Sequence, residues 1–219
     1  MHDAIAPGHP VLGMTYRLVQ FYTRFFHKLT VQGREHIPSR EEQRKSPLIV
    51  VSNHTAGLDP FLIQAACPFH IIWLMARDMM DPRFSPLWEH LNIISVDRTS
   101  KREMASVRMA LRRLEEGEAV GIFPEGGIER PSRHLLTFKS GAGLIISRGK
   151  ARVLPVFIEN TPDVPQAWQS LVIPSSPRIT FGPIMTFESG TKPDEISKRL
   201  QVWFEDQSQW PVLTRPQEV

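Results

Sequence analysis

The chain has 219 residues, and its 41% of apolar side chains are enough for a buried core, which excludes a wholly disordered protein. Its 26 basic and 23 acidic residues leave a net charge of +3, a surplus too small to indicate a nucleic-acid-binding protein. The single cysteine, Cys67, excludes an internal disulfide and a metal site built from cysteines, and we expect it to be a buried apolar residue in the middle of a helix.

The sequence predicts no segment that crosses a membrane. The longest apolar stretch, Phe61 to Ala76, is interrupted by Gln64, Pro68 and His70, whereas a spanning helix needs about 20 mainly apolar residues. The first residues, MHDAIAPGHP, lack the basic start and the apolar run of a secretory signal. We therefore expect an intracellular protein with one large domain.

Residues 11–29 have the clearest helical pattern. Their apolar side chains fall on one half of a helical wheel: Val11, Leu12, Met14, Leu18, Val19, Phe21, Tyr22, Phe25, Phe26 and Leu29. Arg17, Arg24 and Lys28 lie together on the other half. Such a helix can lie in a membrane interface with its basic side chains near anionic headgroups, or it can pack on its own domain. We assign residues 1–30 to this helix and residues 31–219 to an α/β domain.

Strand and helix patterns alternate in the second segment. Strands are expected at residues 47–52, 70–75, 92–96, 118–123 and 152–158, and helices at residues 104–114, around 144–147 ending near Gly149, and at 193–210. A late strand pair is expected over residues 178–187, and the proline-rich residues 159–177 are interpreted as a surface excursion. Continuous apolar strands in this order predict a single α/β domain whose mostly parallel central sheet is covered by helices.

A histidine and an aspartate follow the first of these strands. Asn53 and His54 come directly after it, and Asp59 lies five residues beyond the histidine. Sites in open α/β sheets form at the carboxyl ends of strands. If the intervening residues make one turn, the carboxylate can fix the ring tautomer, and the other ring nitrogen can take a proton from a hydroxyl. The alternative is a structural histidine that caps a turn.

Two further strand ends carry polar and basic residues. The strand at 118–123 leads to Glu125, Gly126 and Gly127, where glycines permit positive φ and close approach of a ligand. Candidate phosphate ligands are basic side chains downstream of it and after the strand at 92–96: Arg98, Arg130, Arg133 and Lys139. We expect the three strand ends to surround one crevice that holds a base and phosphate ligands.

Short blocks occur in a fixed order along residues 31–187: VQGREHIP at 31–38, NHTAGLD at 53–59, VDR at 96–98, FPEG at 123–126 and VLPV at 153–156. In this order they resemble the motifs of the lysophospholipid acyltransferase superfamily, which includes bacterial 1-acylglycerol-3-phosphate acyltransferases. The resemblance implies transfer of a fatty acyl chain from acyl-CoA or acyl carrier protein to the hydroxyl of a lysophospholipid, with 1-acylglycerol-3-phosphate as the first candidate, in phospholipid biosynthesis or remodelling.

The resemblance also implies roles for individual residues. His54 would be the general base and Asp59 would orient it, without a metal or a cofactor. The predicted substrate-binding residues are Asn53, Arg98, Glu125, Gly126, Gly127, Arg130, Arg133 and Lys139. An enzyme of this kind must reach the bilayer without crossing it, which favours the interfacial interpretation of residues 11–29 and a peripheral or monotopic protein at the cytoplasmic face of the membrane.

Two positions depart from the family pattern. The third block commonly continues glycine-threonine-arginine, whereas this chain has Gly126, Gly127 and Ile128, and Ala56 stands where a serine is frequent. The alternatives are therefore an acyltransferase for a different lipid alcohol, a catalytically lapsed lipid-binding protein on the same fold, and a thioester hydrolase.

Overall fold

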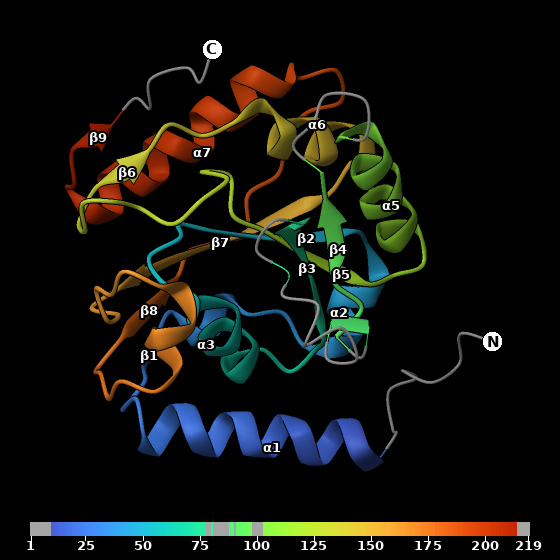
Figure 1. The fold of residues 1–219 in the computed structure, drawn as a ribbon. Coiled ribbons are helices and arrows are strands. Elements are labelled where there is room, and N and C mark those ends of the chain that lie inside the picture. The colour runs from blue at the N-terminus through green and yellow to red at the C-terminus, as the bar shows by residue number, and fades with distance from the viewer. Residues whose placement is uncertain (1–9, 78–79, 81–87, 90, 98–102, 214–219) are drawn as a thin grey trace.

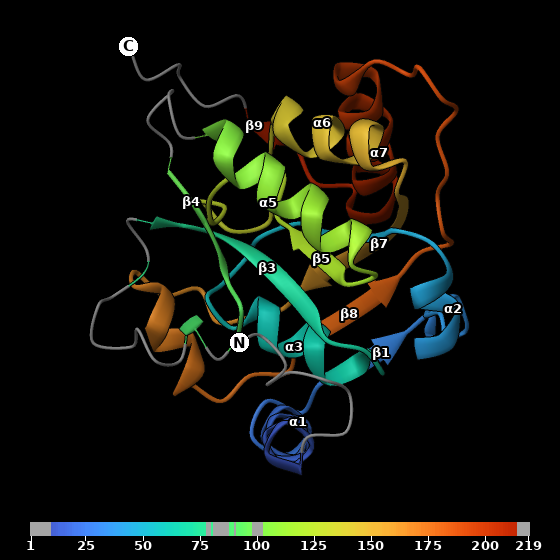
Figure 2. The same cartoon turned by 90° about the vertical axis from the view of Figure 1, so that its right-hand side faces the viewer.

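The protein, seen in a computed structural model, is described at residues 10–77, 80, 88–89, 91–97 and 103–213. Within these residues a seven-stranded sheet crosses the middle of the molecule, with helices on both faces (Figures 1 and 2). Its strands are β1 (Thr30–Gln32), β2 (Leu48–Ser52), β3 (Ile71–Ala76), β4 (Ile94–Val96), β5 (Ala119–Ile122), β7 (Arg152–Glu159) and β8 (Arg178–Phe181). A small second sheet pairs β6 (Leu135–Leu136) with β9 (Val212–Leu213).

The main sheet has the strand order β1-β8-β7-β2-β5-β3-β4. Strands β7, β2, β5, β3 and β4 run parallel to one another, and β8 turns back antiparallel to β7 with β1 parallel beside it. The prediction of a mostly parallel sheet covered by helices is confirmed. Of the expected late strand pair only β8 forms, because Gly182 and Pro183 interrupt the ladder, and Met185 then makes a single bridge to Val153.

The helices are α1 (Pro10–Phe25), α2 (Arg40–Lys45), α3 (Asp59–Ala66), α5 (Glu103–Glu115), α6 (Ser140–Gly149) and α7 (Pro193–Ser208), with 3₁₀ turns η2 (Arg34–His36) and η5 (Ala167–Leu171). Helices α5, α6 and α7 cover one face of the sheet, and α3 lies on the other face with α1 outside it (Figure 2). Cys67 is buried as expected, but the prediction that it lies in the middle of a helix is wrong, since it follows the last residue of α3.

Both faces of the sheet are apolar, because each is covered. Along β2, Ile49 and Val51 belong to the core under α5, α6 and α7, whereas Leu48 and Val50 belong to the core on the α3 side. All four side chains are buried. This is why the strand reads as an unbroken apolar run rather than an alternating one. The parallel direction also brings the carboxyl ends of β2, β5, β3 and β4 to one edge of the sheet.

The middle of the predicted surface excursion, residues 159–177, is in fact packed against the domain. Val164 and Ser170 are buried. A Cβ atom at Gly57 would lie 2.5 Å from the carbonyl oxygen of Ala167, so the first residue of η5 touches the turn that follows His54. The absence of a periodic apolar pattern in this segment concealed its packing.

Helix α1 ends at Phe25, four residues before the predicted end, and residues 1–9 lie outside the described part of the chain. Two hydrogen bonds hold the inner side of α1 against the end of α3. Tyr16 donates one to the Cys67 carbonyl, and Gln20 Nε2 donates one of 3.0 Å to the Ala65 carbonyl. No helix in the described ranges combines the length and the apolar run that crossing a bilayer requires.

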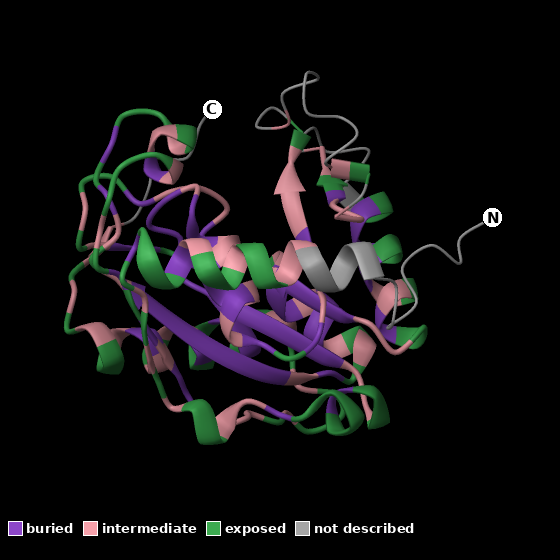
Figure 3. Cartoon of the chain, turned by 90° about the horizontal axis from the view of Figure 1, so that it is seen from below, coloured by how far each residue is buried: buried purple, intermediate pink, exposed green. Residues whose placement is uncertain are grey.

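The outer side of α1 is apolar. Leu18, Phe21 and Phe25 expose 62%, 61% and 63% of their surfaces, and the rings of the two phenylalanines lie 4.5 Å apart. In the view from below, the exposed turns of α1 cross the front of the molecule (Figure 3). The helix therefore packs on its own domain with one side and presents apolar side chains outward with the other.

Gly141 and Gly143 in α6 offer a matched test of helix packing. A Cβ atom at Gly143 would come 2.0 Å from the carbonyl oxygen of Pro193 at the start of α7, whereas one at Gly141 meets no atom within 4 Å. We expect Gly143→Ala to lower the free energy of unfolding by about 1–3 kcal/mol, because the two helices must move apart. Gly141→Ala should leave it unchanged or raise it by up to about 1 kcal/mol. Urea denaturation measures both, and equal effects would contradict this packing.

Candidate active site

Asp59 holds the ring of His54 at the carboxyl end of β2. The distance from His54 Nδ1 to Asp59 Oδ2 is 2.8 Å. The same oxygen accepts hydrogen bonds from the backbone N–H groups of Thr55 (2.7 Å) and Ala56 (2.9 Å), and Oδ1 accepts one from the Thr55 hydroxyl (3.0 Å). Asp59 is also the first residue of α3, where the helix dipole favours a negative charge. With Nδ1 engaged, Nε2 is the ring nitrogen left for a substrate proton.

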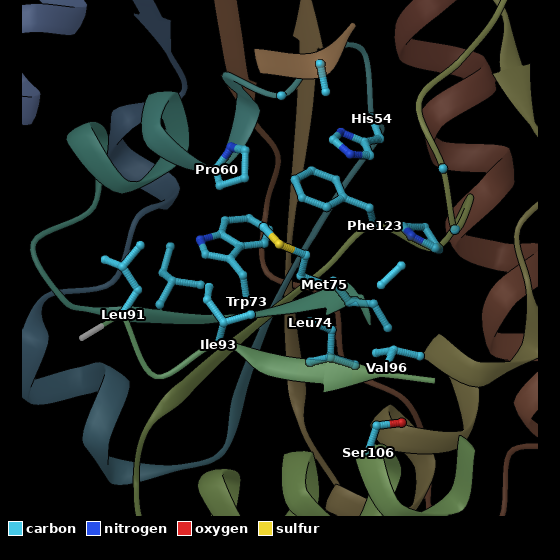
Figure 4. Close-up of a pocket in the computed structure, with 18 of the residues that line it drawn as sticks. His54, Pro60, Trp73, Leu74, Met75, Leu91, Ile93, Val96, Ser106 and Phe123 are labelled. Atoms are coloured by element: carbon cyan, nitrogen blue, oxygen red, sulfur yellow. The ribbon is translucent and has the colours of Figure 1, made fainter. Parts of the chain in front are cut away.

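The other side of the His54 ring is held by aromatic stacking. The ring lies 4.1 Å from that of Phe123 at an interplanar angle of 16°, and Phe123 in turn stacks on Trp73 at 4.8 Å. Figure 4 shows the three rings in a row along the cavity. A Cβ atom at Gly121 would lie 2.4 Å from the Trp73 ring, so a glycine is needed on β5 for this ring to lie flat. The stack fixes the ring plane of His54 at the pocket surface.

Glu125 supports the backbone of His54. Its Oε1 accepts a hydrogen bond of 3.0 Å from the His54 N–H, and its Oε2 accepts one of 3.0 Å from the Leu136 N–H. The side chain is buried, and this burial raises the pKa of the Glu125 carboxyl to about 8 against the opposing effect of the two N–H donors. The geometry makes Glu125 a support for the histidine turn, and it leaves little of this carboxyl surface for the predicted substrate contact.

Glu129 is a site residue that the sequence did not reveal. Its N–H donates a hydrogen bond of 2.8 Å to the His54 carbonyl, and its Oε1 accepts one of 3.0 Å from the Arg133 N–H. Its Oε2 is buried with no hydrogen-bond partner among the described residues. Burial raises the pKa of the Glu129 carboxyl to about 7. The one signal in the sequence was its place directly after the Gly126–Ile128 turn.

Asn53 and Arg130 have polar groups that are already used within the protein. The Asn53 amide is buried and makes hydrogen bonds of 2.9 and 2.8 Å to the backbone carbonyl and N–H of Ile158, so it joins β2 to β7. The Arg130 guanidinium donates hydrogen bonds of 2.6 Å to the carbonyls of Glu129 and Val164. The buried Asn53 amide therefore has no free face for a substrate, whereas the exposed Arg130 is held by the protein's own carbonyls and by an ion pair with Asp163. These partners are distant in sequence, so the sequence did not reveal them.

Lys139 is the predicted cation that the structure brings to the pocket. It lines the cavity beside Gly126 and Gly127. Gly126 has a φ of +69°, and a Cβ atom there would come 3.0 Å from Lys139 Nζ, so the glycine gives the lysine room. Arg133 is exposed and does not line the cavity, and Arg98 lies outside the described residues.

The pocket is a largely apolar cavity of about 1090 Å³ that begins at His54. Trp73, Met75, Leu91, Ile93 and Val96 line it on the side away from His54 in the view of Figure 4. Ala167, Trp168, Leu171 and Val172 from the 159–177 segment form another part of its lining. Within the described residues, no three acidic, histidine or cysteine side chains are grouped so that they could hold a metal ion. The site can thus hold a long apolar group next to a histidine base.

A buried histidine–aspartate pair beside an apolar cavity on a mostly parallel sheet is typical of an enzyme, and the comparisons with known proteins name the family. The sequence model of the family described as Acyltransferase matches residues 28–159, and the chain belongs to this family. The chain also resembles PlsC of Thermotoga maritima, a 1-acyl-sn-glycerophosphate acyltransferase of known crystal structure, with a TM-score of 0.72 and 22% identity over 91% of this chain and 78% of that one. This likeness establishes a shared fold.

Two relatives in sequence carry the name 1-acyl-sn-glycerol-3-phosphate acyltransferase. The protein from Borreliella burgdorferi is 33% identical over 137 residues, which are 61% of this chain and 52% of the relative. The protein from Helicobacter pylori is 25% identical over 180 residues, which are 80% of this chain and 75% of the relative. The chain therefore spans about half the length of the first relative and three quarters of the second.

The raised pKa of Glu129 predicts how stability depends on pH. The carboxyl has an ordinary pKa of 4.5 and one of about 7 in the folded protein. The folded state therefore binds this proton more tightly, and its contribution to stability is full below pH 4.5 and is lost as the pH rises through about 7. We expect Glu129→Gln to reduce the fall in the free energy of unfolding over this range.

Urea denaturation at a series of pH values measures this effect. The remaining fall, which runs from about pH 4.5 until the pH passes about 8, belongs to Glu125. Glu115→Gln, on the exposed side of α5, is the matched control and should follow the wild-type curve. A Glu129→Gln curve parallel to the wild-type curve would contradict the buried ionisation.

Proposed function

We propose that the protein transfers a fatty acyl chain from a thioester to the free hydroxyl of 1-acylglycerol-3-phosphate. One observation carries the proposal: the His54–Asp59 pair lies at the end of an apolar cavity large enough for an acyl chain. Membership of the acyltransferase family and the names of the two relatives support the reaction and the acceptor. The donor would be acyl-CoA or acyl carrier protein.

His54 would act as the general base in a direct transfer. Its Nε2 takes the proton of the acceptor hydroxyl while the oxygen attacks the thioester carbonyl, and Asp59 stabilises the imidazolium that forms. The tetrahedral intermediate then collapses, the carbon–sulfur bond breaks, and the proton passes from His54 to the departing thiolate. This sequence of steps needs neither a metal nor a cofactor. It also needs no covalent enzyme intermediate, in agreement with the position of Cys67, which is buried and does not line the cavity.

The acceptor phosphate would bind at Lys139. Its ammonium group lies beside the Gly126–Gly127 turn, which follows the Phe123 ring that stacks on His54. Ile128, at the position where the family commonly has an arginine, is absent from the cavity lining within the described residues. A phosphate held by Lys139 would orient the acceptor at the end of the pocket where His54 lies.

Helix α1 would bring the enzyme to the membrane in which its acceptor resides. The outward apolar side chains Leu18, Phe21 and Phe25 suit the headgroup–acyl boundary, with the exposed Arg17 and Arg24 beside them. The enzyme would then be a peripheral or monotopic protein of the cytoplasmic face, where soluble acyl donors are available.

His54→Ala tests the assigned base. We expect thiol release from acyl-CoA in the presence of 1-acylglycerol-3-phosphate to fall by about 10²–10⁴-fold, because the hydroxyl loses its proton acceptor. His36→Ala is the matched control and should retain activity within a few fold, since His36 is hydrogen-bonded to the Phe181 carbonyl and does not line the cavity. Residual activity of His54→Ala near the wild-type rate, in a protein with unchanged circular dichroism, would remove His54 from the mechanism.

The same assay separates the alternatives. Thiol release that is independent of added acceptor would identify a thioester hydrolase. Release with a neutral lipid alcohol but not with 1-acylglycerol-3-phosphate would identify a different acceptor. Binding of lysolipid without release from any donor would identify a lapsed, lipid-binding member of the family.

Lys139→Ala tests the phosphate contact. We expect KM for 1-acylglycerol-3-phosphate to rise by about 10-fold or more, since a charge-assisted hydrogen bond contributes about 1.5–3 kcal/mol, with a smaller change for an acceptor without phosphate. Lys139→Arg should restore most of the affinity. Arg133→Ala is the control, since this exposed side chain does not line the cavity. An equal rise in KM for the phosphate-free acceptor would show that Lys139 does not recognise phosphate.

A further inference from the structure

We propose that η5 and the residues after it form, together with the outer side of α1, one membrane-docking surface whose occupant is an anionic phospholipid bilayer. The docking surface consists of Leu18, Phe21, Phe25, Phe26, Trp168, Val172 and Ile173. The inference deepens the proposed function and rests on it only for the identity of the lipid that enters the pocket. In addition to α1, residues 168–173 would then contact the bilayer.

Exposed apolar side chains are concentrated on these two segments. Of the ten large apolar side chains that are exposed among the described residues, seven belong to the docking surface, and the other three are spread over α5 and α7. On the second segment, Trp168 exposes 59%, Val172 62% and Ile173 40% of its surface. A surface of this composition indicates an apolar partner, and tryptophan is typical of the bilayer interface.

Hydrogen bonds fasten the two segments to each other. Tyr22 of α1 donates a hydrogen bond to the Leu171 carbonyl. His27 lies between the Tyr22 hydroxyl (2.8 Å from Nε2) and the Ser175 hydroxyl (2.7 Å from Nδ1). Figure 1 shows η5, in orange, above the carboxyl-terminal end of α1. The two parts of the docking surface therefore meet a partner as one body.

The charges around the docking surface fit an anionic bilayer. Arg17 and Arg24 on α1 and Lys28 just after it are exposed. Residues 10–33 and 164–177 contain no aspartate or glutamate. Apolar side chains flanked by cations alone match acyl chains below anionic headgroups, where each basic residue near the surface adds about 1 kcal/mol of attraction.

The second segment also belongs to the active site. Trp168, Leu171 and Val172 line the cavity that begins at His54. The close approach of Ala167 to Gly57 ties the same segment to the turn between His54 and Asp59. A bilayer that covers the docking surface therefore adjoins the pocket lining, and a lysophospholipid can pass from the membrane into the pocket with its chain along Trp168 and Val172.

Vesicle binding tests the surface without reference to activity. The full chain should co-sediment with phosphatidylcholine–phosphatidylglycerol vesicles, and more weakly with phosphatidylcholine alone. We expect Trp168→Ser and Val172→Ser each to weaken partitioning by about ten-fold, as loss of one interfacial apolar side chain implies. Val202→Ser, on an equally apolar but isolated exposed position of α7, is the matched control and should bind as the wild type does. Wild-type partitioning in both docking variants would overturn the proposal.

Quenching of tryptophan fluorescence by acyl-chain-brominated phosphatidylcholine, mixed with phosphatidylglycerol, gives a second readout with conservative variants. Trp168→Phe should remove most of the quenching. Trp210→Phe should retain it, because this residue lies in the chain between α7 and β9, which Figure 1 shows at the opposite end of the molecule from α1. Unchanged quenching in Trp168→Phe would overturn the proposal even if Trp168→Ser failed to fold. Failure of acyl transfer with normal vesicle binding would instead overturn the proposed function alone.

Discussion

The carboxylate of Asp59 is the group on which the rest of the site depends. It is fully buried, and such a charge is tolerated only when hydrogen bonds replace the lost water. Those bonds come from the His54 ring, from two consecutive backbone N–H groups and from a hydroxyl. The hydrogen bonds that the Asp59 carboxylate accepts therefore hold the turn, stabilise the start of α3 and orient the base. The same turn contains Gly57, against which Ala167 packs.

The backbone of His54 is held as firmly as its ring. Its N–H and its carbonyl both pair with the glutamate-bearing turn after β5, through the Glu125 side chain and the Glu129 N–H. Burial raises the pKa of both glutamates, and each of them is further raised by the negative charge of Asp59. The three acids near one histidine thus differ in environment: Asp59 is surrounded by donors, whereas Glu129 has an oxygen with none. Different environments are what allow neighbouring carboxyls to carry different charges.

Local pattern predicted the sheet and the His54–Asp59 pair, because strand runs, glycine turns and a five-residue spacing act over short distances. The contacts that local pattern did not reveal depend on partners far along the chain. Asn53 is a residue type that often binds ligands, yet its amide makes hydrogen bonds to the backbone of Ile158 on a neighbouring strand. Arg130 was predicted as a phosphate ligand from its place after the glycine turn, and its hydrogen bond to the Val164 carbonyl could not be read from that place. Residues 159–177 gave no periodic signal, since they pack through backbone approach and a few side chains rather than along a regular face.

The ends of this last segment lie side by side. Glu159 at the end of β7 pairs with Arg178 at the start of β8, and their side chains form an ion pair of 2.9 Å. The chain between them leaves the sheet and returns to the same point, so it is a cassette whose replacement alters no strand register. It carries part of the pocket lining but neither His54 nor Asp59. Exchange of this segment would therefore change the shape of the lipid that the pocket accepts, while the sheet and the His54 base stay as they are.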